Sequence, residues 1–263
     1  MPDLSDDYAI AAHIEGSDVY MPRWESDAAA FRNRSGGRAR LGVSYGPSER
    51  MAFDHFLPEG AAKGTMIFVH GGYWLRNDRS LWSHFAAGAL AQGWAVVMPS
   101  YDLCPSVRIA GITQQIAQAV MQVAAGNGGP ISLSGHSAGG HLVARMLAPG
   151  MLPAWVRERL AHVVPIAPLT DLEPLLHTSM NDDFGMDAGM ARAESPRHQP
   201  APEVPVTVWV GAAERPALLE QAQWLAQAWG CDHVVVPGAH HFNVIDALTD
   251  PKSDLIRRLT TLR

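Results

Sequence analysis

A serine flanked by glycines follows a short apolar run near the middle of the chain. The run ISLS, residues 131–134, leads into Gly135-His136-Ser137-Ala138-Gly139, and apolar residues at helical spacing follow. This order predicts a strand, a tight turn and a helix, with Ser137 held in a strained backbone conformation that exposes its hydroxyl. The glycines on either side would let the strand and the helix approach closely. The alternative, on this motif alone, is an ordinary glycine-rich turn.

A second glycine motif lies upstream, also at the end of an apolar run. MIFV, residues 66–69, leads directly into His70-Gly71-Gly72-Tyr73-Trp74. A loop of this kind can offer backbone N–H groups to the negative oxygen that forms when a nucleophile attacks a carbonyl. We expect the donors to be Gly72, Tyr73 and Ala138, with Gly71 as a further candidate.

A serine nucleophile needs a base and an acid that orients the base, and both candidates follow Ser137 in the chain. Glu214 comes just after the apolar run 206–210, and His241 comes in the loop after the run 234–236. We predict that His241 takes the proton of Ser137 and that Glu214 holds the His241 ring. Asp171 is the alternative acid, and His240 competes with His241 because adjacent side chains cannot both face Ser137.

The remaining histidines and aromatic residues near these motifs have several interpretations. His70 is expected to hold the glycine loop through its ring, and His136 to pack within the turn. Tyr73, Trp74 and His136 are the substrate-binding candidates, whereas Trp82 is expected in the core. The histidines lack the spacing of a helical zinc motif and have no cysteine pair beside them, so we expect no metal and no cofactor.

The elements that would position these residues alternate between strand and helix along the chain. Strands are expected at 39–46, 50–57, 65–69, 94–98, 130–134, 162–166, 205–210 and 233–236, the first two as an antiparallel hairpin. The alternation predicts an α/β fold: a mostly parallel central sheet of about eight strands with helices on both faces. Apolar residues at helical spacing in 107–125 predict one of the covering helices.

Two segments depart from this alternation. Residues 1–38 are expected to form a helical arm that could pack over the site entrance, with Tyr20, Trp24, Ala28 and Phe31 on one face. Residues 170–201 form a longer insertion, either a lid or a surface loop. We also consider Asp182 and Asp183 in this insertion as contacts for a substrate amino group.

Composition and charge limit the classes of partner. The chain has 263 residues and a net charge of −6 without any basic tract, so we expect no nucleic-acid partner. No apolar run approaches 18 residues and the first residues are acidic, which predicts no membrane span and a cytoplasmic enzyme. Cys104 and Cys231 are expected to be reduced. We expect one domain over 1–263 and a small-molecule substrate, and we leave a homodimer open.

The motifs together resemble arylformamidases, also called kynurenine formamidases, within the hormone-sensitive-lipase-like group of α/β-hydrolases. The resemblance rests on HGGYW at 70–74, GHSAGG at 135–140, VGAAE at 210–214 and HHFNVID at 240–246. It implies an α/β-hydrolase fold and the cleavage of N-formyl-L-kynurenine to formate and L-kynurenine. It also implies that Gly72 and Tyr73 form the oxyanion hole. The chain departs from the family at two positions. Glu214 stands where the family usually has Asp, and His240 stands before His241 where the family tends to have Asp.

Two rival functions use the same residues differently. A broad carboxylesterase or thioesterase would use the same Ser137, His241 and Glu214 on small acyl esters. A non-catalytic binding protein on a hydrolase scaffold is the other rival, and it would be expected to have lost one of these three residues.

Overall fold

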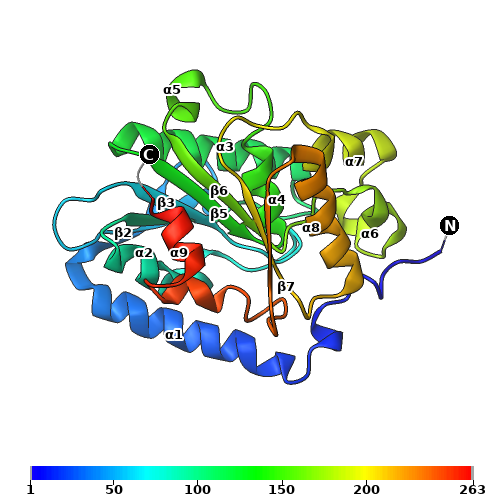
Figure 1. The fold of residues 1–263 in the computed structure, drawn as a ribbon, viewed down its shortest axis with the longest axis horizontal. Helices are drawn as coiled ribbons and strands as arrows, with labels where there is room; N and C mark the ends of the chain where they lie inside the picture. The colour runs from blue at the N-terminus through cyan, green and yellow to red at the C-terminus, as the bar shows by residue number, and fades with distance from the viewer. Residues whose placement is uncertain (1, 262–263) are drawn as a thin grey trace.

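The computed structural model describes residues 2–261, and a single eight-stranded sheet runs through it (Figure 1). The strand order is β1-β2-β4-β3-β5-β6-β7-β8. β1 pairs with β2 and β2 with β4 in antiparallel fashion, and all other pairs are parallel. The predicted mostly parallel sheet with an opening hairpin is confirmed. The strands are β1 (Ala39–Ser44), β2 (Ala52–Phe56), β3 (Thr65–Val69), β4 (Ala95–Pro99), β5 (Ile131–His136), β6 (Leu160–Ile166), β7 (Thr207–Gly211) and β8 (Asp232–Val236).

Helices cover both faces of this sheet, as the alternating pattern predicted. One face packs against α3, α4 and α8, and the other against α1, α2 and α9 (Figure 1). The helices are α1 (Tyr20–Ser35), α2 (Ala87–Ala91), α3 (Ile109–Gly126), α4 (Ala138–Arg145), α5 (Ala154–Arg157), α6 (Asn181–Phe184), α7 (Ala188–Glu194), α8 (Pro216–Trp229) and α9 (Asp254–Leu259).

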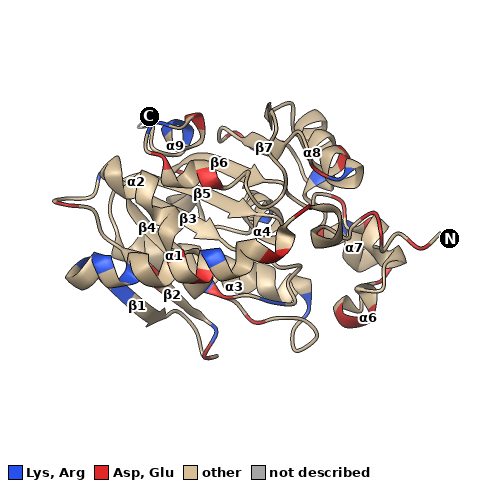
Figure 2. Ribbon diagram, turned by 90° about the horizontal axis from the view of Figure 1, so that it is seen from below, with Lys and Arg blue, Asp and Glu red and all other residues tan. Residues whose placement is uncertain are grey.

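The inner strands are apolar because both of their faces are covered. No Lys, Arg, Asp or Glu occurs in β3 to β7, and Figure 2 shows the charged residues on the surrounding helices and loops. Near-continuous apolar strands are typical of parallel sheets that are buried on both sides. Burial of this kind supplies most of the free energy that holds the fold together.

The N-terminal arm is helical only in its later part. Short 3-10 turns at Ala11–His13 and Ser17–Val19 precede α1, whereas residues 2–10 form no helix. Trp24 and Ala28 of α1 are fully buried, because the apolar face that the spacing predicted packs against the 3-10 helix Arg79–Ala86. The arm thereby runs along the sheet rather than standing apart from it.

The insertion 170–201 folds into short helices beside α8. It contains α6, α7 and the 3-10 turns Glu173–His177 and Pro196–His198. Glu194 at the end of α7 is buried and forms an ion pair of 3.2 Å with Arg145 of α4. This contact fixes one end of the insertion to the helix that follows Ser137.

Candidate active site

The sequence motifs come together at the carboxyl ends of the parallel strands. β3 ends at the glycine loop, β5 ends at Ser137, β7 leads to Glu214, and the loop after β8 carries His241. In open parallel sheets ligands bind at this edge, because all the loops that follow the strands meet there.

Ser137 lies in the tight turn that its glycine neighbours predicted. Its φ of 57° and ψ of −119° are in a region that residues with a side chain rarely adopt. Its N–H donates to the Ile166 carbonyl at 2.8 Å, which anchors the turn to β6. A Cβ on Gly139 would overlap the Val69 carbonyl oxygen, and one on Gly135 would overlap the Gly139 carbonyl oxygen. The two glycines are therefore required by the close approach of β5, β3 and α4.

His241 and Glu214 form a buried pair. Glu214 Oε1 lies 2.6 Å from His241 Nδ1, and only 1% and 3% of the two side chains are exposed. With Nδ1–H donating to the carboxylate, the lone pair of a neutral ring lies on Nε2. Ser137 and His241 line the same cavity. This arrangement can hold the ring of a base in one tautomer beside a nucleophile.

The alternative acid and the alternative base lie elsewhere. Asp171 accepts from Arg197 Nη1 at 3.0 Å, and no contact joins it to His241 in the described chain. The His240 ring faces the arm, with Nε2 3.1 Å from the Tyr20 hydroxyl. Of the candidates that the sequence left open, Glu214 and His241 are the two that contact each other.

His136 lies beneath His241 and contacts its backbone. His136 Nε2 is 2.9 Å from the His241 carbonyl oxygen, and the two ring centroids are 4.5 Å apart. Burial holds the pKa of His136 well below its usual value, so the ring is neutral and Nε2–H donates to that carbonyl. His136 packs within the turn as expected and also lines the cavity, whereas its contact with a substrate stays a prediction.

The glycine loop places free backbone donors at the cavity. The N–H groups of Gly72, Tyr73 and Ala138 have no acceptor within the described residues. Gly72 has a φ of 115°, and Tyr73 and Trp74 have φ values of 52° and 57°. A Cβ on Gly71 would lie 2.7 Å from the His136 carbonyl oxygen, so this residue must be glycine for the loop to lie against the serine turn.

His70 holds this loop, as expected. Its Nδ1 is 2.8 Å from the Gly71 carbonyl oxygen, and its own carbonyl accepts from the Tyr101 hydroxyl at 2.9 Å. The His70 and Tyr101 rings stack at 4.4 Å. Burial lowers the pKa of His70 to about 4, so the ring is neutral near pH 7 and Nδ1–H donates.

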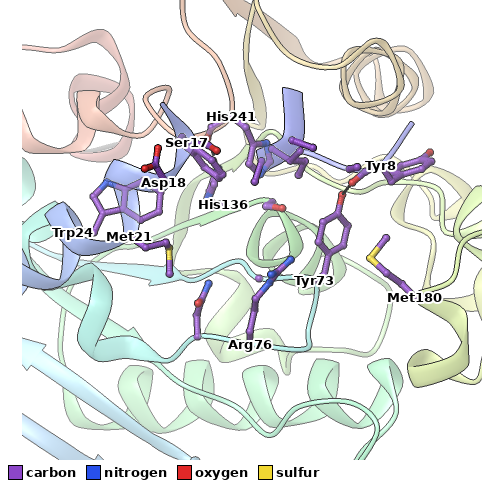
Figure 3. Close-up of a pocket in the computed structure, with 18 of the residues that line it drawn as sticks. Tyr8, Ser17, Asp18, Met21, Trp24, Tyr73, Arg76, His136, Met180 and His241 are labelled. Carbon is purple, nitrogen blue, oxygen red and sulfur yellow. Dashed lines mark hydrogen bonds between the residues drawn. The ribbon is translucent and has the colours of Figure 1, made fainter. Parts of the chain in front are cut away.

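A cavity of about 530 Å³ opens over Ser137, and the arm supplies much of its wall (Figure 3). The volume lies within the range of small-molecule sites. The lining residues contributed by the arm and by α1 are Ser5, Tyr8, Ala9, Ile10, Ala11, Ala12, Ser17, Asp18, Met21 and Trp24. The arm therefore covers this cavity, although residues 8–10 lie outside any helix, and its role at the site entrance stays a prediction.

The arm is fastened directly to the glycine loop. The Tyr73 hydroxyl donates to the Tyr8 carbonyl at 2.7 Å, and the Tyr8 hydroxyl accepts from Gln221 at 2.9 Å. Arg215 forms an ion pair of 3.2 Å with Asp6. Burial raises the pKa of Tyr73 far above its usual value, so the hydroxyl keeps the proton that it donates.

The structure corrects the expectation for Trp74. This residue was a substrate-binding candidate, but its side chain is fully buried and does not line the cavity. Its ring packs edge-on against His141 and Phe184, at centroid distances of 5.0 and 5.6 Å. Trp82, expected in the core, is 2% exposed and lies at the cavity wall. The sequence predicted that both residues lie near the glycine loop, but it could not predict which way their rings point.

The insertion contributes little to the cavity. Ser179 and Met180 line it, whereas Asp182 and Asp183 on α6 are exposed and do not. These two carboxylates are therefore not placed to contact a substrate in this cavity, contrary to that expectation. Asp18 and Arg76 are the acidic and basic residues that do line the cavity, and no motif in the sequence pointed to either of them.

Neither a metal-binding cluster nor a membrane-spanning helix occurs in the part of the chain that the structure describes. Between residues 2 and 261, no three His, Cys, Asp or Glu side chains come together as a metal site would require. Within that same range, no helix combines the length and the apolar character needed to cross a membrane.

Comparison with known proteins assigns the fold and a class of chemistry. A family model described as α/β hydrolase fold matches residues 66–237. Kynurenine formamidase of Salmo salar is 26% identical over 238 residues, covering 83% of this chain and 80% of that protein. Kynurenine formamidase of Danio rerio is 25% identical over 268 residues, covering 95% and 87%.

A solved structure is more similar in sequence. It is the crystal structure of a protein from a Silicibacter species that is provisionally described as a thioesterase. It superposes with a TM-score of 0.97 at 58% identity, over 99% of this chain and 100% of that one. Together these similarities identify the chain as a hydrolase, and the interpretation as a non-catalytic scaffold is set aside.

Proposed function

We propose, because this chain belongs to the α/β-hydrolase fold family, that it is a serine hydrolase acting on the N-formyl group of N-formyl-L-kynurenine. The observation that carries the proposal is the buried contact of 2.6 Å between Glu214 and His241, beside Ser137 in one cavity. Two curated relatives with this activity, similar over most of the chain, support the choice of substrate.

The reaction follows from the positions of the three residues. His241 Nε2 takes the proton of the Ser137 hydroxyl as its oxygen attacks the formyl carbon. The resulting oxyanion accepts from the N–H groups of Gly72, Tyr73 and Ala138. The intermediate then collapses: the C–N bond breaks, the amine takes the proton from His241, and a formyl ester remains on Ser137. Water activated by His241 hydrolyses this ester to formate.

The shape of the cavity suits an aromatic formamide. A formyl carbon carries only hydrogen, so the acyl side needs little room. The leaving group is a substituted aniline, and Trp82 and Phe242 line the same cavity as His241 and Ser137. Flat aromatic surfaces of this kind bury a ring without requiring hydrogen bonds from it.

A short-chain ester or thioester is the second candidate. The solved structure at 58% identity carries a thioesterase description, and ester cleavage would use the same residues. Acyl transfer to Ser137 is common to the two reactions, so only the leaving group distinguishes them.

Comparative kinetics tests the assignment. We would measure kcat/KM for N-formyl-L-kynurenine, 4-nitrophenyl acetate and a short acyl thioester, with Ser137→Ala as the blank. We expect the formamide to exceed both esters by several orders of magnitude, since specificity is a ratio of these constants. Turnover of an ester with no turnover of the formamide would overturn the substrate while leaving the nucleophile in place.

A further inference from the structure

Two residues of opposite charge line the cavity without a partner. Asp18 lies in the 3-10 turn Ser17–Val19 of the arm, and Arg76 follows the glycine loop. Neither side chain makes an ion pair or hydrogen bond with any described residue. Other charged residues near the cavity are paired: Arg79 with Asp54 at 2.9 Å, and Arg215 with Asp6 at 3.2 Å.

The two side chains belong to different walls. Figure 3 shows Asp18 beside Trp24 and Ser17 on the arm, and Arg76 extending from the segment that follows Tyr73. A molecule bound between the walls can therefore meet a carboxylate from one segment and a guanidinium from the other. Both side chains are exposed, so water can still solvate their charged groups.

Free charges of both signs suit a zwitterion. A guanidinium can bind a carboxylate through two parallel hydrogen bonds, and a carboxylate binds an ammonium group at short range. A free α-amino acid carries both groups on one carbon. A simple acyl ester carries neither, and it would gain nothing from Asp18 or Arg76.

We propose that Arg76 binds the carboxylate, and Asp18 the ammonium group, of a free α-amino acid attached to the leaving group of the substrate. This inference rests on the proposed function and extends it: the enzyme selects zwitterionic aryl formamides. Tyr73 and Arg76 lie three residues apart in one loop, so the chain segment that offers an oxyanion donor also carries the specificity contact.

The test uses three formamides that share the same scissile bond. N-formyl-L-kynurenine carries both charges, its analogue without the amino group carries only the carboxylate, and formanilide carries neither. The variants are Arg76→Met and Asp18→Asn, which remove charge and keep much of the shape. Asp7→Asn and Arg34→Met remove the same charges from exposed positions of the arm and of α1 that do not line this cavity.

We expect each cavity variant to raise KM for N-formyl-L-kynurenine about two- to fivefold with little change in kcat, because one exposed charge contact is lost. For the analogue without the amino group, Arg76→Met should raise KM and Asp18→Asn should not. Formanilide constants should stay unchanged in both variants, and the two control variants should match the wild type on all three substrates.

Two results would overturn the inference, and they are distinguishable. If the wild type cleaves N-formyl-L-kynurenine and formanilide equally well and neither variant changes either, the zwitterion site is wrong while the formamidase reaction stands. If no formamide is cleaved but esters are, the proposed function fails and the site assigned to its substrate falls with it.

Discussion

The contact between Glu214 and His241 makes a quantitative prediction. Glu214→Gln keeps the size of the side chain and an oxygen that can accept from Nδ1–H, but it removes the negative charge. At 2.6 Å, and with an effective dielectric constant of ~20, attraction between a carboxylate and an imidazolium is on the order of 6 kcal/mol. The imidazolium forms only when His241 has taken the proton of Ser137, so this attraction acts mainly in the transition state.

The expected loss is therefore in kcat. The hydrogen bond from Nδ1–H to the amide oxygen replaces part of this attraction. Since about 1.4 kcal/mol corresponds to a factor of ten in rate, the remainder should lower kcat about 10⁴-fold. KM should change little, because the substituted residue, Glu214, does not line the cavity.

The assay compares matched variants on one substrate. We would measure kcat and KM for Glu214→Gln, with Ser137→Ala as the floor and Asp171→Asn as the control for the other acid. Asp171 pairs with Arg197, so its variant should keep kcat within a few-fold of the wild type. Thermal unfolding would show that each variant is folded. A folded Glu214→Gln that loses less than about 100-fold, or an equal loss in Asp171→Asn, would refute the reasoning.

Three further predictions concern stability. Burial lowers the pKa values of His70 and His141 to about 4, so below pH ~6.5 the unfolded chain binds protons that the folded chain does not. The free energy of unfolding should therefore fall by on the order of 2 kcal/mol per histidine between pH 7 and 5. Equal urea midpoints at the two pH values would contradict this. Gly139→Ala should destabilise the fold by at least about 2 kcal/mol and abolish activity, whereas Gly111→Ala, in the exposed first turn of α3, should stabilise it by about 0.5 kcal/mol. Equal thermal unfolding midpoints for the two variants would argue against the close approach of α4 and β3. Trp24→Ala should destabilise the fold by about 3–5 kcal/mol, because the ring is buried against the core. It should also raise KM, because the ring lines the cavity. If the variant unfolded at the same temperature as the wild type, the arm would not be packed as described.

The parts of the site that sequence could predict carry local signals. Ser137 stands between glycines at the end of an apolar run, and His241 and Glu214 follow at the ends of later runs. Such signals are readable because a tight strand-to-helix turn tolerates few residue types. The contact between Glu214 and His241 has the predicted partners, whereas their roles in catalysis remain predictions.

The cavity walls could not be predicted because their geometry is tertiary. Tyr73 and Trp74 are adjacent in the chain and both have positive φ, yet Tyr73 lines the cavity and Trp74 lies in the core. No periodicity or motif marks residues 8–10, because they line the cavity from outside any helix. In the sequence nothing distinguishes Asp18 and Arg76 from other charged residues. They line the same cavity only because the folded arm packs over the segment that follows the glycine loop.

The arm has a consequence for the order in which the molecule becomes complete. It is synthesised well before its partners: Asp6 contacts Arg215 across 209 residues, and Tyr8 contacts Gln221 across 213. During synthesis the arm cannot make these two contacts until Arg215 and α8 have left the ribosome. A nascent chain that already contains β5 and Ser137 therefore has its nucleophile but neither the docked arm nor Glu214 and His241. We expect activity to appear only after α8 and the loop that follows β8 have been synthesised.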